Sequence, residues 1–322
     1  MPIPSLNRLS IVIPSHHRSD LLRVCLGSVV QYAPAGSEII VVDDASPDAV
    51  ASATARAVSG VRVVRLDRQR GFAAAANAGI RASQGAVVEM LNDDTEVQPG
   101  WADAALRWFD NIHVGAVAPL VLGWPDGQLI DSAGDCYYIG GFASKRGHGQ
   151  RLTEPFLEPC RVFGASAAAG FFRRAALDRV GLFSETFGSY FEDVDLAFRL
   201  NRAGFHAVCE PASRVLHHVS ASYGRVGRKL LQRQSCNEER VFWRNLPDPV
   251  LWQALPKHFA VLVGKALRRL GEGNLTPWLF GRLEAWHGLR ALLTHRRELA
   301  GDAVTPFDTW GVDETLASKP LR

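Results

Sequence analysis

Residues 9–14 read LSIVIP and residues 38–44 read EIIVVDD, and these two stretches decide the fold class. Each is a short, continuous run rich in β-branched residues that stops at a proline or at acidic residues. Such a run predicts a parallel strand that is buried on both faces of a sheet. Between the two runs, residues 20–32 carry apolar side chains at helical spacing, and Asp20 is placed to cap the predicted helix.

The same alternation continues along the chain. We predict helices over residues 49–57 and 72–82, and strands over residues 61–66 and 86–91. Alternation at this spacing is typical of α/β proteins with a Rossmann-like, doubly wound and mostly parallel sheet. Residues 123–164 are rich in Gly, Pro and aromatic residues with weak periodicity, which predicts long loops and short strands.

The composition indicates a folded protein of the cell interior. The 322 residues are 47% hydrophobic and 21% charged, which is ordinary for one large α/β domain with an appendage. The five cysteines include no CxxC pair, which argues against a disulfide framework or a zinc ribbon and favours a reducing cytoplasm. We find neither a signal peptide nor an apolar run near the ~18–20 residues that span a bilayer, so we expect a cytoplasmic protein.

Charge is distributed unevenly along the chain. Residues 225–322 carry 16 Lys and Arg against 10 Asp and Glu, a net charge of +6, whereas residues 1–224 carry a net charge of −3. We therefore treat residues 226–322 as a separate, basic helical region. Two interpretations of its cations stay open: docking at a membrane surface, or packing against the rest of the chain. The residues concerned are Arg240, Trp243, Arg244, Lys265, Arg268 and Arg269.

Polar residues follow three of the predicted strands at their carboxyl ends. Residues 14–17 (PSHH) follow the first strand, Asp43 and Asp44 the second, and residues 92–94 (NDD) the strand over 86–91. Ligands of doubly wound sheets bind in the crevice at this edge of the sheet. We therefore expect the three clusters to face one site, although they are far apart in sequence.

Adjacent carboxylates repel each other unless a cation or hydrogen-bond donors compensate them. At Asp93 and Asp94 a divalent metal carrying a diphosphate would do so, and an Asp-rich turn is the alternative. Asp44 is placed where an acidic side chain reads the nucleoside in dinucleotide-binding folds. The alternative there is a turn beginning at Ser46 that caps the next helix.

A third acidic segment, residues 189–195 (SYFEDVD), opens a predicted helix that ends before Gly204. Ser189 and Glu192 have the spacing of a capping box, so Glu192 is interpreted either as a cap or as a site residue. Asp193 has no such local role, and a carboxylate at a helix start facing a crevice is suited to act as a general base.

The remaining candidates are weaker when each is taken alone. Asp195 and Arg199 lie one helical turn apart and are predicted to form a surface ion pair. His217 and His218 follow a strand-like stretch and are either metal ligands or surface residues. Arg70 precedes a glycine, where a guanidinium would meet a phosphate or a base carbonyl, or lie in a solvated loop.

Read in order, six motifs resemble the large family 2 of inverting glycosyltransferases, which have the GT-A fold, and most closely its bacterial rhamnosyltransferase-like members. The resemblance covers residues 9 to about 225. It implies a catalytic domain over residues 1–225, with a nucleotide-sugar half (1–122) and an acceptor half (123–225). The motifs are SIVIPSHHR at 10–18, EIIVVDDASP at 38–47, RGFA to NAGI at 70–80, LNDDT at 91–95, GLFSE at 181–185 with YFEDVDLAFRL at 190–200, and HxxSxS at 217–222.

The resemblance also implies roles for individual residues. Asp193 would deprotonate the acceptor hydroxyl with Glu192 assisting, and Asp94 and His217 would hold a divalent metal, Mg²⁺ or Mn²⁺. Asp44 would contact the base of the donor. The full set implied to bind the nucleotide sugar is Pro14, Ser15, His16, Arg18, Asp44, Arg70, Asn77, Asn92 and Asp93.

The implied reaction is a single displacement that moves a sugar from a UDP- or dTDP-sugar to a hydroxyl group, with inversion. The acceptor would be a bacterial cell-surface glycan or a lipid-linked saccharide. The expected partners are thus the donor and the acceptor, with a membrane surface as a further candidate and no nucleic acid. The protein would act in the cytoplasm or at the inner face of the plasma membrane.

Three other classes fit the sequence less well. A nucleotidyltransferase that makes a nucleotide sugar usually has a Gly-rich, basic loop after its first strand, whereas residues 14–18 (PSHHR) contain no glycine. A dinucleotide-dependent oxidoreductase would need G-x-G-x-x-G at this place. An inactive nucleotide-sugar-binding module would not need Asp94, Asp193 and His217, and metal-dependent turnover would exclude it.

Overall fold

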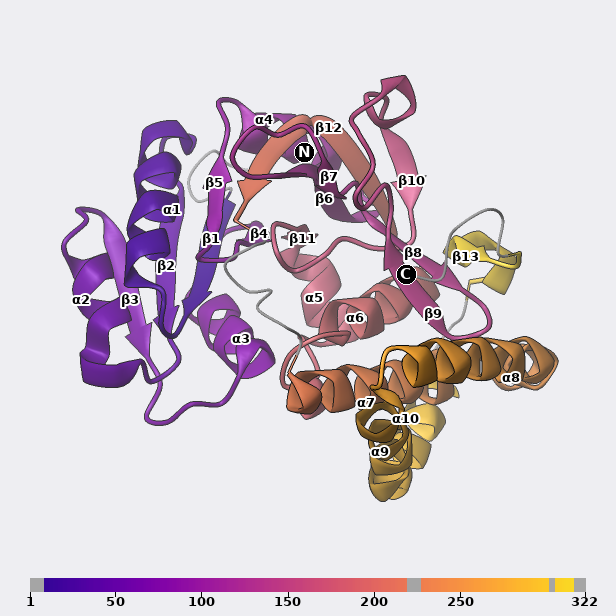
Figure 1. The fold of residues 1–322 in the computed structure, drawn as a ribbon. Helices are drawn as coiled ribbons and strands as arrows, with labels where there is room; N and C mark the ends of the chain where they lie inside the picture. The colour runs from indigo at the N-terminus through magenta and orange to yellow at the C-terminus, as the bar shows by residue number, and fades with distance from the viewer. Residues whose placement is uncertain (1–8, 219–226, 301–304, 316–322) are drawn as a thin grey trace.

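The structure, a computed structural model, describes residues 9–218, 227–300 and 305–315 and is built around one large sheet (Figure 1). Within these residues the strand order is β10-β12-β6-β11-β4-β1-β2-β3, with β5 paired to β12 and β7 paired to β6. The strands are β1 (Leu9–Ser15), β2 (Glu38–Asp43), β3 (Val61–Arg65), β4 (Val87–Met90), β5 (Thr95–Val97), β6 (Val114–Gly123), β7 (Ile130–Ser132), β10 (Cys160–Val162), β11 (Phe171–Arg173) and β12 (His206–His217).

Most of this sheet is parallel, as predicted. Strands β1, β2, β3 and β4 pair in parallel, and β12 pairs in parallel with β6. Strand β11 lies antiparallel between β4 and β6, so these two strands share one direction. The predicted GT-A type of fold is a mixed sheet of this kind, in which the carboxyl ends of the parallel strands meet at one edge.

Helices cover both faces of the sheet because the side chains of each central strand alternate. In β1, Ile11 and Ile13 pack with α1 (Ser19–Tyr32), α2 (Val50–Arg56) and α4 (Trp101–Leu106). Val12 points to the other face and packs with α3 (Phe72–Ala82), α5 (Arg174–Val180) and α6 (Glu192–Arg202). The doubly wound arrangement predicted from the sequence is therefore confirmed.

Helix α3 approaches β1 very closely at Gly79. A Cβ atom at this position would lie 2.2 Å from Cγ1 of Val12 and 2.8 Å from Cγ2 of Val42. Only a residue without a side chain allows this approach, so Gly79 fixes how α3 sits on the sheet.

The predicted cap at Asp20 is wrong, and the capping box that was one of the two interpretations of Glu192 does not form. Helix α1 begins at Ser19 after Arg18, and Asp20 lies inside its first turn with no side-chain cap. Helix α6 begins at Glu192, and its N-cap residue Phe191 has a left-handed backbone (φ 71°) with no side-chain cap hydrogen bond. The capping box therefore does not form, because the chain before α6 is not in the extended conformation that a capping box requires.

Residues 123–164 contain short strands and loops, as predicted. Strands β8 (Asp135–Tyr138) and β9 (Phe142–Lys145) form a hairpin, and β13 (Val312–Asp313) joins β8 to make a second, three-stranded sheet. The chain thus returns from its C-terminal region to pair with this hairpin.

The basic C-terminal region is helical in the part that the structure describes. It contains α7 (Arg228–Asn245), α8 (Asp248–Gly271), α9 (Leu275–Ala285) and α10 (Leu289–Ala300), which lie below the sheet in Figure 1. None of the described helices is long and apolar enough to cross a membrane. The predicted boundary at residues 225 and 226, and Ser220 and Ser222 of the last motif, lie outside the described residues.

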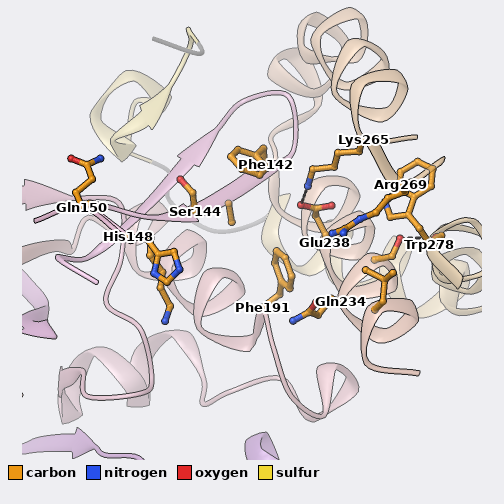
Figure 2. Close-up of a pocket in the computed structure, with 15 residues that line it drawn as sticks. Phe142, Ser144, His148, Gln150, Phe191, Gln234, Glu238, Lys265, Arg269 and Trp278 are labelled. Carbon is orange, nitrogen blue, oxygen red and sulfur yellow. Dashed lines mark hydrogen bonds and ion pairs between the residues drawn. The ribbon is translucent and has the colours of Figure 1, made fainter. Parts of the chain in front are cut away.

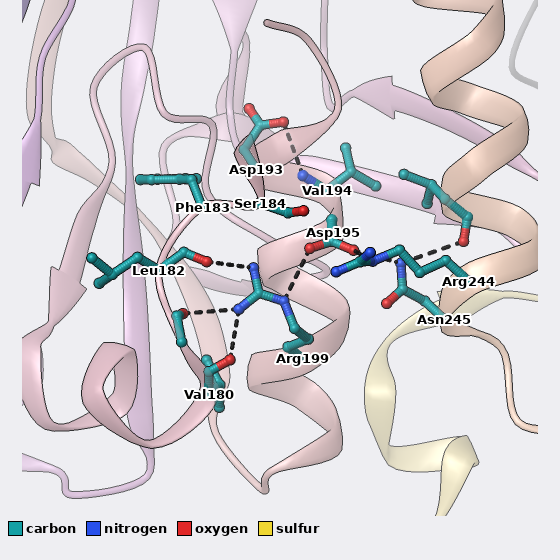
Figure 3. A network of polar contacts seen from close by, with 12 residues as sticks. Val180, Leu182, Phe183, Ser184, Asp193, Val194, Asp195, Arg199, Arg244 and Asn245 are labelled. Atoms are coloured by element: carbon teal, nitrogen blue, oxygen red, sulfur yellow. Dashed lines mark hydrogen bonds and ion pairs between the residues drawn. The ribbon is translucent and has the colours of Figure 1, made fainter. Parts of the chain in front are cut away.

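Helix α7 is tied to α6 through a buried ion-pair network (Figure 3). Oδ2 of Asp195 accepts from Nε of Arg199 (3.0 Å), and Oδ1 accepts from Nε of Arg244 (2.7 Å) and Nδ2 of Asn245 (3.0 Å). Asp195 is fully buried and Arg199 is 7% exposed. The prediction of a surface pair was therefore wrong: α7 covers it, which helical spacing alone does not reveal.

Candidate active site

The structure brings the ends of β1, β2 and β4 together, as the sequence predicted. Oγ of Ser15 donates to Oδ2 of Asp93 (2.6 Å), and Nδ1 of His16 lies 2.7 Å from the carbonyl oxygen of Asp44. Pro14 is partly exposed at the same edge. Polar groups separated by up to 78 residues thus share one edge of the sheet.

The two carboxylates at the end of β2 have different surroundings. Asp43 is fully buried and accepts from the backbone N–H groups of Ser46 and Ser52, so it holds the turn that follows the strand. Asp44 accepts from the N–H groups of Arg70 (2.7 Å) and Gly71 (2.8 Å). Asp44 therefore orders the loop before α3, and its expected contact with a base stays a prediction.

Two other residues expected at the nucleotide sugar make contacts across the domain. The guanidinium of Arg70 donates to Oε2 of Glu185 (2.7 Å). Asn77 is 2% exposed, donates to the carbonyl oxygen of Phe183 (2.8 Å) and accepts from its N–H (3.0 Å). Both ends of the Asn77 amide therefore join α3 to the segment before α6, and the expected contact of Asn77 with the nucleotide sugar stays a prediction.

Asp94 and His217 lie side by side although they are 123 residues apart in sequence. Oδ1 of Asp94 is 3.1 Å from Nε2 of His217, whose Nδ1 is 3.0 Å from Oδ2 of Asp131. Burial alone would lower the pKa of His217, but hydrogen bonds from its ring to Asp131 and Asp94 raise it from 6.5 to about 9. The imidazole is therefore oriented between two carboxylates, and a carboxylate such as Asp131 on one ring nitrogen is the usual partner that orients a metal-binding histidine.

The neighbouring carboxyl group of Asp93 is also perturbed. Burial raises its pKa to about 7, although the hydrogen bond from Ser15 and the charge of Arg18 act in the opposite direction. Arg18 stands at the start of α1, close enough for its charge to act on Asp93. A group that changes its charge this easily responds strongly to any cation bound beside it.

His217 borders a cavity of about 380 Å³. Asn92 and His217 line it from the sheet, and Glu192 and Asp193 line it from the start of α6. Asp193 is held by two backbone donors, the N–H of Val194 (2.9 Å) and that of Ala167 (3.2 Å). Asn92 and His217, from the ends of two strands, thus share one space with the acidic start of α6.

Two of the acidic groups in this cavity are strongly affected by burial. Glu192 is 5% exposed and its Oε2 has no hydrogen-bond partner, and Asp135 likewise has an unpartnered Oδ2. Burial, with the charge of Asp193 next in importance, raises the pKa of both groups well above the usual values. Asp193 is the partly exposed member of the three.

Helix α7 fixes the loop that precedes Glu192 and Asp193, the first residues of α6. Tyr190 and Phe191 both have left-handed backbones, at φ 74° and 71°, a conformation that costs large side chains energy. The buried amide of Asn237 donates to the carbonyl oxygens of Phe187 (2.9 Å), Ser189 (3.1 Å) and Tyr190 (2.9 Å). The C-terminal region therefore helps to set the position of the acidic helix start.

A second cavity, of about 400 Å³, adjoins the first (Figure 2). The two cavities share a wall formed by residues 143–145 and Phe191. Beyond Phe191 the second cavity is lined by polar and aromatic side chains from β9 and from α7, α8 and α9. Those used below are Gln234, Glu238, Lys265, Arg269 and Trp278.

The cations proposed for membrane docking contact groups of the protein itself. Lys265 pairs with Glu238, Arg268 and Arg269 pair with Glu272, and Arg244 pairs with Asp195. A guanidinium nitrogen of Arg240 donates to the carbonyl oxygen of Thr186 (3.1 Å), and Trp243 packs against the rings of Phe242 and Trp286. The alternative interpretation, packing against the rest of the chain, describes these residues better.

The sequence did not indicate three residues near the site. Asp131 orients His217, Asp135 lines the first cavity, and Nζ of Lys145 contacts both carboxylate oxygens of Asp131 at 2.9 and 3.0 Å. All three lie in the stretch with weak periodicity. Asn237 is a fourth such residue. The sequence predicted only that it lies in the helical C-terminal region.

Comparisons with known proteins place this geometry in a family. The model of glycosyl transferase family 2 matches residues 10–181. The chain is 31% identical over 234 residues to the O-antigen biosynthesis protein RfbC of Myxococcus xanthus, covering 69% of this chain but 18% of that protein. It is 30% identical over 214 residues to the N-acetylglucosaminyl-diphospho-decaprenol L-rhamnosyltransferase of Mycobacterium tuberculosis, covering 58% of this chain and 68% of that protein.

Solved structures agree on the fold. The mannosyltransferase PcManGT from Pyrobaculum calidifontis, in complex with GDP-Man and Mn²⁺, has a TM-score of 0.55 at 19% identity and covers 92% of this chain and 86% of that chain. GalNAc-T7 with UDP, GalNAc and Mn²⁺ has a TM-score of 0.58 at 18% identity, and the match covers 75% of this chain and 51% of that chain. The fold is therefore GT-A. The chain belongs to glycosyltransferase family 2.

Proposed function

We propose that this enzyme transfers a sugar, with inversion, from a UDP- or dTDP-sugar to a hydroxyl group of a bacterial cell-surface glycan or lipid-linked saccharide. The observation that carries the proposal is the convergence of His217, Asn92 and Asp193 on one cavity. Two matched relatives are named for O-antigen biosynthesis and for rhamnosyl transfer to a lipid-linked saccharide.

Asp94 and His217 would hold the divalent metal, Mg²⁺ or Mn²⁺. A carboxylate oxygen and an imidazole nitrogen already lie 3.1 Å apart, and both are donors that these metals accept. Among the described residues no group of three or more such side chains is arranged to hold a metal, so the diphosphate would complete the coordination. Bound there, the metal would neutralise the charge that develops on the leaving diphosphate.

Asp193 would take the proton from the acceptor hydroxyl while the hydroxyl oxygen of the acceptor forms a bond to the anomeric carbon of the donor. The bond from that carbon to the diphosphate oxygen breaks, and the electron pair leaves with the diphosphate. The two N–H groups that hold Asp193 leave further lone pairs of its carboxylate available for this proton. Burial raises the pKa of both Glu192 and Asp135, which makes either of them a poorer candidate for the nucleophile of a double displacement.

We assign the second cavity to the acceptor, because it begins where the first ends, at Phe191. Aromatic rings beside amide and hydroxyl groups are typical of sites that bind sugars. The carboxylate that lines this cavity, Glu238, is paired with Lys265 and Arg282, so the space is not repulsive to an anionic acceptor such as a sugar diphosphate. We place the reaction in the cytoplasm, at the inner face of the plasma membrane.

The test is donor hydrolysis with a panel of UDP-, dTDP- and GDP-sugars, with Mn²⁺ or with EDTA. We expect one nucleoside diphosphate to be released in a metal-dependent way by the wild type and not by Asp94→Ala. Asp193→Asn should still bind that nucleotide in a thermal shift assay but lose transfer to octyl glycosides or octyl glycosyl diphosphates by about 10²–10⁴-fold. Full transfer by Asp193→Asn would contradict the assignment of the base.

A further inference from the structure

Helix α8 exposes a row of large apolar side chains. Trp252 is 67% exposed, Phe259 68%, Val263 43%, Leu267 65% and Leu270 61%. Their spacing along the helix, at i, i+7, i+11, i+15 and i+18, places all five on one side. Such a row is expected in a helix that is covered by something apolar.

The row continues onto α9. Leu279, Leu283 and Trp286 are 44%, 63% and 44% exposed, and all three line a groove of about 410 Å³ together with Val263 of α8. These eight residues, on α8, α9 and the short helix η6 (Trp286–Gly288) that follows α9, form what we call the α8–α9 apolar face. In Figure 1 both helices lie at the edge of the molecule, away from the sheet. Continuous exposed apolar surfaces of this kind mark interaction sites.

We propose that the α8–α9 apolar face docks the enzyme on an anionic lipid surface. The inference rests on the proposed function only for the location, the inner face of the plasma membrane. The face itself is defined by exposure and helical spacing. Trp and Phe side chains on one side of a basic helical region are typical of helices that lie in the plane of a membrane surface.

Charge favours lipid over a second copy of the chain. Residues 225–322, which carry the face, have a net charge of +6, and the rest of the chain has a net charge of −3. Two copies meeting through this region would repel each other, whereas an anionic lipid surface attracts it. The acidic residue next to the end of α8, Glu272, is paired with Arg268 and Arg269 and does not oppose this attraction.

The proposal differs from the one that the sequence suggested. Arg244, Lys265 and Arg268 of α7 and α8 are paired with carboxylates of the protein, so not all cations of these helices can contact lipid head groups. Attachment would come mainly from the apolar face inserting among the acyl chains, and the net positive charge would select the anionic surface.

The test is flotation of the full-length enzyme with vesicles of phosphatidylcholine and phosphatidylglycerol in equal parts. The variant is Phe259→Ser with Leu267→Ser, two exposed positions where folding is not at stake. The matched control is Ile112→Ser, because Ile112 is 69% exposed on the turn before β6, far along the chain from this face. We expect the wild type and the control to float, and the double variant to bind about tenfold less. A Phe259→Trp variant should float like the wild type.

Two further measurements separate this inference from its alternatives. Hydrolysis of the donor in solution should be equal in all four proteins, so a failure of flotation would not be confused with a failure of the proposed function. Light scattering should give the same mass for the wild type and the double variant. The proposal would be overturned by a wild type that does not float, by a double variant that floats like the control, or by a double variant that turns a dimer into a monomer.

Discussion

Nε2 of His217, at the end of β12, lies 3.1 Å from Oδ1 of Asp94, which follows β4. The pairing of β12 with β5, in which His217 is opposite Thr95, brings the two residues together. Asp131 contacts the other ring nitrogen and so fixes the orientation of the imidazole. The pairing of strands in the sheet thus forms the candidate metal site.

Replacing Asn237 by Ala should slow transfer more than it weakens donor binding. The substitution leaves the carbonyl oxygens of Phe187, Ser189 and Tyr190 without their shared donor, which should cost about 1–3 kcal/mol and loosen the left-handed turn before Asp193. We expect kcat to fall about tenfold, with little change in nucleotide affinity. Gln232→Ala, on the same helix, is the control; equal kcat in both variants would show that Asn237 only stabilises the fold.

Filling the second cavity should affect the acceptor alone. Gln234→Trp places a large ring among the residues that line this space, so we expect the KM for the acceptor to rise about tenfold. Donor hydrolysis should be unchanged, because we propose that the donor binds outside this cavity. Gln253→Trp, at an exposed position of α8, should change neither quantity. An unchanged KM for the acceptor in Gln234→Trp would contradict the assignment of this cavity to the acceptor.

Two glycines in helices should respond in opposite directions. In Gly79→Ala the new Cβ would meet Val12 at 2.2 Å, and overpacking of this kind costs about 1–3 kcal/mol. In Gly27→Ala, inside α1, the new Cβ meets nothing within 4 Å, so the better helix former should add about 0.5–1 kcal/mol. Urea denaturation of both variants measures the two effects; a neutral Gly79→Ala would mean that α3 can move away from the sheet.

The buried network around Asp195 should make stability depend on pH in acid. Despite burial, which alone would raise it, Arg199 and Arg244 lower the pKa of Asp195 from 3.8 to about 2. A lowered pKa stabilises the folded state above the unfolded value, and this contribution is lost as the pH falls from about 3.8 towards 2. Asp195→Asn leaves two guanidinium groups without their carboxylate, which should cost about 3–5 kcal/mol at pH 7.

The difference in unfolding free energy between wild type and Asp195→Asn should therefore shrink as the pH is lowered through this window. Denaturation at pH 7 and near pH 3 measures it. A difference that stays constant over this range would show that the carboxylate is not the charged partner of the two arginines.

The sequence predicted the central fold well because that information is local. Continuous apolar runs mark β1 and β2, and the bounds of α3 agree with the predicted residues 72–82. The same runs place the polar strand ends at one edge, so the convergence of Ser15, Asp44 and Asp93 could be expected from the order of the strands alone.

The missed features depend on contacts with distant segments. No capping box forms at Ser189 because Asn237 of α7 holds the preceding carbonyl groups in another geometry. The Asp195–Arg199 pair is buried because α7 lies over it. Asp131 orients His217 from a stretch with no periodic pattern, so nothing local marked it.

The measurement that tests the account most directly is Mn²⁺ binding, followed by electron paramagnetic resonance, in the presence of the nucleoside diphosphate that the donor panel identifies. We expect Asp94→Ala and His217→Ala each to weaken Mn²⁺ binding at least about tenfold. His218→Ala is the control, because His218 is the next residue and contacts Glu96 instead. Loss in the first two variants with wild-type binding in the control would establish the Asp94–His217 site. Wild-type Mn²⁺ affinity in His217→Ala would contradict it.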